Sequence, residues 1–223
     1  MHNNNIPDIR GNLRRHLIEV PECIQHASGI RIFGKLIRSL AFTTDVSIIK
    51  NINADSIIAV YPFTPQPAIT QAITMVADVP VFCGVGGGLT RGRRVVNLAL
   101  DAEFKGAIGV VVNAPTPNET IMAMRKIIDI PIMVTVVSEN TDIKSRLDAG
   151  ATILNVSGAA KTANIVRQIR DEFPEVPIVA TGGPTEETIM ATIEAGANAI
   201  TYTPPTTGEL FKISMDKYRR ELS

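Results

Sequence analysis

Residues 148–151 read Asp148-Ala-Gly-Ala151, residues 194–197 repeat this stretch as Glu194-Ala-Gly-Ala197, and Phe104-Lys-Gly-Ala107 is a looser copy. A second motif, an acidic residue before an apolar-Pro-apolar triplet, alternates with the first at Asp78-Val-Pro-Val81, Asp129-Ile-Pro-Ile132 and Glu175-Val-Pro-Ile178. Each copy precedes or opens a short apolar run, and glycine is common where a helix ends and the chain turns. The motifs recur every roughly 45–50 residues, which indicates a fold built from like pairs of β–α units.

The rest of the chain follows the same alternation. Short β-branched runs, typical of parallel strands buried on both faces, occupy residues 35–42, 56–61, 79–84, 107–113, 130–137, 152–156, 177–181 and 199–203. Helical patterns follow them at residues 45–52, 66–76, 93–104, 118–128, 141–148, 162–173, 186–194 and 208–222. A doubly wound open sheet shares such alternation, but the count of eight favours closure. We therefore predict an α/β fold, a single (β/α)8 TIM barrel with an extra N-terminal helix.

The extra helix is expected in residues 1–33, which we interpret as an extension of the barrel domain over residues 34–223. Apolar residues at helical spacing between Ile9 and Ile24, with Arg14, Arg15 and Glu19 available for the opposite face, predict a helix there. Such a helix would close the bottom of the barrel. Packing against a second subunit, in a possible homodimer, is the alternative.

Composition limits the classes of partner. Lys plus Arg and Asp plus Glu number 22 each, and aromatic residues make up 4% with no Trp, so we expect no nucleic-acid partner. Two cysteines suit a reducing compartment. The first residues lack the pattern of a leader, and no apolar run approaches about 20 residues, so we expect a cytoplasmic protein with no membrane partner.

Metal and cofactor sites are not expected. The three histidines, His2, His16 and His26, all precede the barrel, which removes a histidine base and a histidine-rich metal site from the strand ends. Asp45 and Glu139 are the carboxylates expected right at strand ends, too few for a divalent-metal cage.

The loops that follow the strands are where function lies in a barrel of this kind. After the seventh expected strand, Gly182 and Gly183 offer backbone N–H groups at a helix N-terminus, a typical anion site. With Gly158 and Thr203 from the neighbouring strand ends, they form the phosphate site that we predict. The alternative is a tight turn whose helix is capped by its own acidic first turn.

Further candidate ligand contacts lie after the third expected strand, at the end of the fourth and within the sixth. The Gly-rich segment over residues 84–94 carries Arg91, Arg93 and Arg94, and we expect it to close over an anionic ligand as a lid does; a long solvated loop is the alternative. Asn113 and Asn155 are expected to hydrogen-bond the ligand, or else to satisfy each other in the core.

The stretch Val179-Ala-Thr-Gly-Gly183, followed by an acidic helix, resembles the ribulose-phosphate-binding group of barrels, and loosely the keto-deoxy-phosphogluconate aldolases among them. The likeness in strand order runs from Lys35 to the C-terminus, but the motif covers only about twenty residues around Thr181. The resemblance implies a phosphate held after the seventh and eighth strands.

The chain also departs from this group of barrels. Where they show a second glycine motif, this sequence reads Thr201-Tyr-Thr-Pro-Pro205, and proline offers no N–H donor. Where the aldolases carry a Schiff-base lysine, it reads Ile153-Leu-Asn-Val156. The departures put the specific activities of the group in doubt.

Two residues are our candidates for acid–base chemistry. Glu139 would act as a base if the barrel mouth desolvates it. Lys35 would take part if it points into the barrel, with a structural ion pair as the alternative. The first hypothesis is an enzyme acting on a small anionic metabolite, expected to be phosphorylated, by lyase or isomerase chemistry at the carboxyl-terminal face. The alternatives are a non-catalytic ligand-sensing barrel and a hydrolase that uses Glu139.

Overall fold

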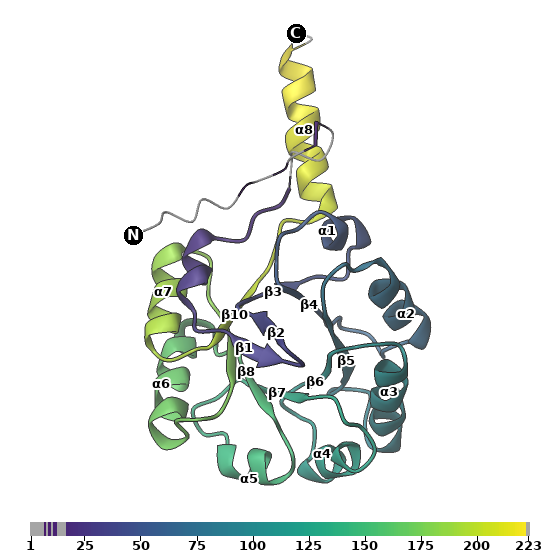
Figure 1. Cartoon of the computed structure of the whole chain (residues 1–223), viewed down its shortest axis with the longest axis vertical. Helices are drawn as coiled ribbons and strands as arrows, with labels where there is room; N and C mark the ends of the chain where they lie inside the picture. Colours follow the sequence, from purple (N-terminus) through teal and green to yellow (C-terminus); the bar gives the residue numbers. More distant parts are fainter. Residues whose placement is uncertain (1–6, 8, 10, 13–16, 222–223) are drawn as a thin grey trace.

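The predicted barrel is confirmed by a computed structural model that describes residues 7, 9, 11, 12 and 17–221. Eight parallel strands close in the order β10-β3-β4-β5-β6-β7-β8-β9 (Figure 1). Their bounds are β3 (Ser39–Phe42), β4 (Ser56–Ala59), β5 (Val81–Gly86), β6 (Gly109–Val112), β7 (Ile132–Val136), β8 (Ile153–Val156), β9 (Ile178–Thr181) and β10 (Ala199–Tyr202). They lie within or close to the expected runs, because strands buried on both faces are almost continuously apolar.

A helix follows each barrel strand, and all of these helices except the last surround the barrel, as Figure 1 shows. They are α1 (Val46–Lys50), α2 (Pro67–Val76), α3 (Arg93–Phe104), α4 (Asn118–Arg125), α5 (Ile143–Asp148), α6 (Thr162–Glu172), α7 (Glu186–Glu194) and α8 (Thr207–Glu221). A short 3₁₀ helix, η2 (Ala159–Lys161), precedes α6. Within the described residues, every helix is too short or too polar to cross a membrane.

The run expected at residues 35–42 is two strands rather than one. β1 (Ile30–Ile32) and β2 (Lys35–Ile37) form an antiparallel hairpin, and β3 begins the barrel. Phe33 and Gly34 have φ of 45° and 83°, as a two-residue hairpin turn of type I′ requires. The β2 strand ends at Ile37 because the Asp55 carboxylate accepts hydrogen bonds from the N–H groups of Arg38 and Ser39, at 2.8 and 2.9 Å.

This hairpin closes the amino end of the barrel. Ile30, Ile32 and Ile37 are buried in the same apolar cluster as the residues that fill the barrel interior. The helix expected between residues 9 and 24 falls partly on residues outside the described ones. Residues 17–21 are described and are not helical, and a 3₁₀ helix, η1 (Glu22–His26), follows them.

The barrel interior is filled by one inward-facing residue from each strand. These residues are Leu40, Ile58, Phe82, Val111, Met133, Ile153, Val179 and Ala199. Phe82 fits only because β6 offers Gly109 opposite it: a Cβ at Gly109 would lie 2.5 Å from the Phe82 ring. A second apolar cluster packs the outer faces of the strands against the helices.

Candidate functional site

The mouth of the barrel lies one layer above this apolar interior. Side chains alternate across a strand, so the residues two positions further on also face the barrel axis. On three adjacent strands they are Phe42, Val60 and Gly84, which we call the apolar arc. On the other five they are Asn113, Thr135, Asn155, Thr181 and Thr201, which we call the polar arc.

Hydrogen bonding within the polar arc is incomplete. Asn155 Nδ2 donates to Thr135 Oγ1 at 3.4 Å, and Thr181 Oγ1 donates to Ser157 Oγ at 3.3 Å. Both distances are long for such bonds. In the described part of the chain, the buried atoms Asn155 Oδ1 and Thr201 Oγ1 have no hydrogen-bond partner. Thr201 is only 8% exposed, so bulk solvent hardly reaches its hydroxyl. An unsatisfied buried polar atom costs about 1–3 kcal/mol, so the arc is poised to bind a ligand group.

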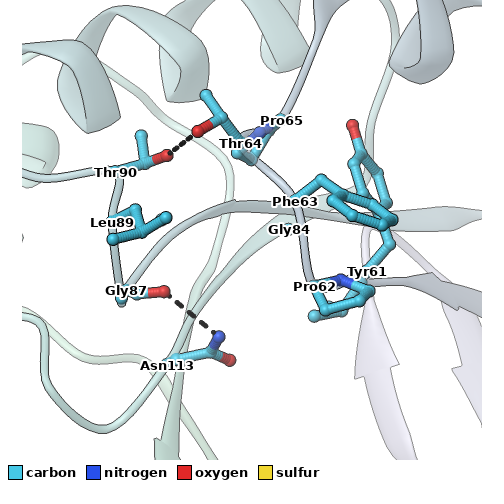
Figure 2. Close-up of a pocket in the computed structure, with 13 residues that line it drawn as sticks. Tyr61, Pro62, Phe63, Thr64, Pro65, Gly84, Gly87, Leu89, Thr90 and Asn113 are labelled. Carbon is cyan, nitrogen blue, oxygen red and sulfur yellow. Dashed lines mark hydrogen bonds between the residues drawn. The ribbon is translucent and has the colours of Figure 1, made fainter.

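A pocket of about 210 Å³ opens beside the apolar arc (Figure 2). Val60, Gly84 and Asn113 contribute its barrel side, and the loops over residues 61–65 and 86–90 contribute the rest. Its volume lies below the usual range for drug-sized ligands, so it suits a metabolite of few atoms.

The two loops that form the pocket are joined to each other. Thr90 Oγ1 donates to Thr64 Oγ1 at 3.1 Å, and Asn113 Nδ2 donates to Gly87 O at 3.4 Å, both drawn in Figure 2. Gly87 has φ of 101°, and a Cβ there would lie 2.5 Å from that of Asn113. The glycine therefore lets the loop approach Asn113 closely, which holds that side chain at the edge of the pocket.

Arg91 lies on the same loop but turns back on it. Its Nε donates to Gly88 O at 2.7 Å, and the residue is exposed. Arg93 and Arg94 line a groove with Pro67 of α2, outside the mouth. Arg91 directly follows the pocket residue Thr90 in sequence, but the residues that line the pocket include none of the three arginines.

The glycines of the predicted phosphate site already have structural roles. Gly158 N donates to Thr162 Oγ1 at 3.0 Å. A Cβ at Gly182 would lie 2.8 Å from Ile189, and one at Gly183 would lie 2.6 Å from Thr188, so packing against α7 already requires both glycines. Thr203 is exposed, beyond Thr201 on the same strand end. Phosphate binding by these residues stays a prediction.

The N-terminus of α7 carries its own cap. Thr185 Oγ1 accepts from Thr188 N, and Thr188 Oγ1 accepts from Thr185 N at 3.2 Å, which is a reciprocal capping box. The cap competes with an anion for the N–H groups of this turn.

Glu139 and Lys35 lie at opposite ends of the barrel. Glu139 follows β7 and accepts from Lys161 Nζ at 3.1 Å, over a groove between α5 and α6. Lys35 is exposed on the hairpin at the amino end, where it pairs with Ile32. The interpretation that Lys35 points into the barrel and joins the site is therefore wrong. The first expected strand was two strands, and Lys35 belongs to the one that closes the bottom.

Two other reactive groups near the strands are not available for chemistry. Hydrogen bonds from Thr207 and Ser47 lower the pKa of Asp45 to about 2, so this carboxylate caps α1 and ties α8 to it. Burial raises the pKa of the Cys83 thiol to about 12, which keeps it protonated and unreactive.

The sequence did not lead us to predict Thr135 and Thr201 as site residues, and Thr181 was considered only as part of the glycine turn that follows the seventh strand. Each lies two positions after a buried apolar residue of its strand, so the phase of inward-facing positions was the signal that could have found them. Asn113 and Asn155 were expected to contact a ligand, and the structure brings both to the mouth.

The chain is similar in fold to several solved structures. A putative phosphonomutase from Burkholderia cenocepacia matches with a TM-score of 0.62 and 16% identity, over 90% of this chain and 96% of that one. A 2,3-dimethylmalate lyase, described as a PEP mutase/isocitrate lyase superfamily member, matches with a TM-score of 0.60 and 14% identity, over 94% and 85%. Phosphonopyruvate hydrolase in complex with oxalate and Mg²⁺ matches with a TM-score of 0.56 and 12% identity, over 82% and 92%.

Sequence comparison adds no closer relative: no protein-family model and no curated protein matches the chain. The resemblance to ribulose-phosphate-binding barrels stays a prediction. At identities of 12–16%, the solved structures show the fold alone, and that fold is a (β/α)8 barrel.

Proposed function

We propose that the protein is a lyase-type enzyme that acts on a small anionic metabolite at the carboxyl-terminal mouth of the barrel. The observation that carries the proposal is the polar arc, where Asn155 Oδ1 and Thr201 Oγ1 are buried without a partner. Buried polar atoms of this kind mark positions where a ligand supplies the missing hydrogen bonds. The proteins of similar fold, which include a lyase, a hydrolase and a putative phosphonomutase, support an enzyme of this general kind.

The two arcs divide the proposed ligand between them. The apolar arc and the adjoining pocket receive its carbon skeleton, and the amide and hydroxyl groups of the polar arc bind its carbonyl or hydroxyl oxygens. Its anionic group lies at the rim, where Arg91 and Lys161 supply positive charge. Phosphate contacts from Gly158, Gly182, Gly183 and Thr203 belong to the same proposal for a phosphorylated ligand.

Glu139 is the proposed base. It turns from its ion pair with Lys161 toward the bound ligand and takes the proton of a hydroxyl group. A carbonyl then forms at that carbon, the adjacent C–C bond breaks, and its electron pair moves into an enolate on the other fragment. Hydroxyl and amide donors of the polar arc stabilise the enolate oxygen.

A divalent metal does not fit the mouth. The similar hydrolase structure contains Mg²⁺. Among the residues that the structure describes, no group of three or more His, Cys, Asp or Glu could hold a metal ion. The eight mouth positions carry neither a carboxylate nor an imidazole, so no step of the proposal passes through a metal.

A second candidate function is a ligand-sensing barrel without turnover. The observation that favours it is the uncharged character of all eight mouth positions. Binding needs only the polar arc, whereas catalysis also needs Glu139 to move inward.

A thermal-shift screen of small hydroxy acids, keto acids and their phosphorylated forms tests the proposal, because a compound that binds the native state raises its melting temperature. Asn155→Leu should weaken the binding of an active compound by at least about tenfold, since it removes a polar group from the arc. Asn164→Leu, on the exposed face of α6, is the matched control.

Turnover of the same compounds separates the two candidate functions. Cleavage supports the lyase, and binding without turnover supports the sensor. A screen in which nothing binds, or in which the two asparagine variants respond alike, contradicts the site itself.

A further inference from the structure

The last helix, α8, extends away from the ring of helices instead of packing on the barrel (Figure 1). None of its 15 residues is buried. Phe211 is 66% exposed and Tyr218 is 54% exposed, so two large aromatic side chains lie open to solvent on this one helix.

The place that α8 would take on the barrel wall is already filled. The segment before the hairpin covers the wall between α7 and α1, where Val20 and Ile24 join the apolar cluster outside the strands. η1 lies along α7 (Figure 1). At the other side, Ile18 N donates to Asn51 O at 2.8 Å, directly after α1. The apolar side of α8 is therefore left without a partner within the described chain.

That apolar side is continuous with a groove on the barrel. Leu210, Phe211, Ser214, Met215 and Tyr218 recur at helical spacing on one side of α8. Together with Ile18, Ile48 and Asn51, they line a single groove between α8 and α1. We call these residues the α8 face.

We propose that the α8 face binds the α8 face of a second copy of this chain, with the two helices antiparallel. A two-fold pairing of this kind presents the same patch from both copies. Centred on Ser214, it places Leu210 of one copy opposite Tyr218 of its partner. The small Ser214 then lies at the crossing point, where it lets the two backbones approach.

Charge favours the same arrangement. At the base of α8, Glu209 and the α1 cap residue Asp45 outnumber Lys212. The tip carries the three cations Lys217, Arg219 and Arg220 against the two acids Asp216 and Glu221, which pair with Arg219 and Lys217. An antiparallel pair brings each tip toward the base of the other helix.

One side of α8 alone is too small for a stable interface, so the interface must also include the groove at α1. A helix of 15 residues is about 22 Å long and roughly 10 Å across, so one side of it presents about 350 Å². A stable interface buries about 800 Å² per partner. The groove at α1 must supply the remainder, which is why the partner's helix has to reach the barrel.

Light scattering coupled to gel filtration, at micromolar protein concentration, tests the pairing. The full chain should have twice the mass of one copy. Phe211→Asp should reduce it to one copy, because it buries an unpaired charge in the interface. Ile213→Asp is the matched control: Ile213 is 67% exposed on the opposite side of the same helix, and its substitution should leave the dimer intact.

Circular dichroism of both variants checks that α8 and the barrel remain folded, since an equal helix content excludes a general loss of structure. A monomeric full chain overturns the proposal, as does a dimer that both variants preserve or both disrupt. Deletion of residues 1–16 addresses the other occupant of the face, the chain's own N-terminus. The deletion should leave a dimer, and a monomeric full chain that dimerises only after the deletion would assign the face to those residues instead.

Discussion

The two ends of the barrel differ in how buried polar groups are paired. At the amino end, one Asp55 oxygen accepts three hydrogen bonds from Arg38 and Ser39. Within the described residues, the buried side-chain atoms that lack a partner are Thr116 Oγ1, Asn155 Oδ1 and Thr201 Oγ1, and all three lie on the carboxyl-terminal side. The difference indicates that the amino end, which the hairpin closes, contributes mainly to stability. The carboxyl-terminal end, which is open, keeps polar atoms free to bind a ligand.

The largest expected effect is on catalysis at the open end. Once a substrate is known, Glu139→Gln should lower turnover about 10²–10⁴-fold while ligand affinity stays within a few-fold, because the amide cannot accept a proton. Glu175→Gln makes the same change at the amino end, just before β9, and should leave turnover unaltered. Steady-state kinetics of both variants measure the contrast. Equal loss of turnover and affinity in Glu139→Gln would make Glu139 a binding residue, and no loss would favour the sensor.

The next effect is on stability at the closed end. Asp55→Ala removes the acceptor of three hydrogen bonds and leaves the Arg38 and Ser39 N–H groups unpaired, so it should lower the free energy of unfolding by about 3 kcal/mol. Asp148→Ala breaks only the exposed pair with Lys144 and should cost less than about 0.5 kcal/mol. Urea denaturation measures both, and a similar loss in the two variants would contradict the special role of the closed end.

Asp55 also explains why the first expected strand was predicted incorrectly from the sequence. The strands after the first were predicted closely because burial on both faces leaves a continuous apolar run. The break between β2 and β3 depends on Asp55, which is 17 residues beyond Arg38 in sequence. No local pattern records such a contact. Lys35 was consequently placed in the first barrel strand, whereas it belongs to the hairpin strand β2.

Two other features, the polar residues at the mouth and the position of α8, also depend on contacts between residues that are distant in sequence. Thr181 and Thr201 look like ordinary strand residues until the inward-facing phase of the closed barrel is known. The position of α8 could not be predicted from its own amphipathic pattern, because it depends on Val20 and Ile24 filling the wall between α7 and α1. Asn113 and Asn155, in contrast, could be singled out from the sequence because they end or lie within apolar strand runs, and their contact with a ligand stays a prediction.

A pair of hydroxyl deletions tests the contrast between the ends with opposite signs. Ser39→Ala removes a hydroxyl that donates to Asp55 Oδ2 and accepts from Asp55 N, and should cost about 2 kcal/mol. Thr201→Val removes a buried hydroxyl without a partner and should stabilise the ligand-free protein by about 1 kcal/mol, or about 3 °C in melting temperature. Calorimetry measures both shifts. Destabilisation in both variants would mean that the Thr201 hydroxyl is already satisfied.

The smallest expected effect concerns Asp45, a carboxylate at the open end that behaves like those at the closed end. Its pKa is lowered from 3.8 to about 2, chiefly by the hydrogen bonds from Thr207 and Ser47. A folded-state pKa below the unfolded value stabilises the protein above the unfolded pKa, and the contribution disappears as the pH falls from about 4 to about 2. Because the group is partly exposed, solvent screening leaves about 1 kcal/mol of this stabilisation. Asp45→Asn should therefore lower the free energy of unfolding by about that amount at pH 7 and by almost nothing near pH 2. Urea denaturation of wild type and variant across this range isolates the contribution from that of all other carboxylates. A difference that stays constant with pH would show that Asp45 acts through its shape as a helix cap and not through its charge.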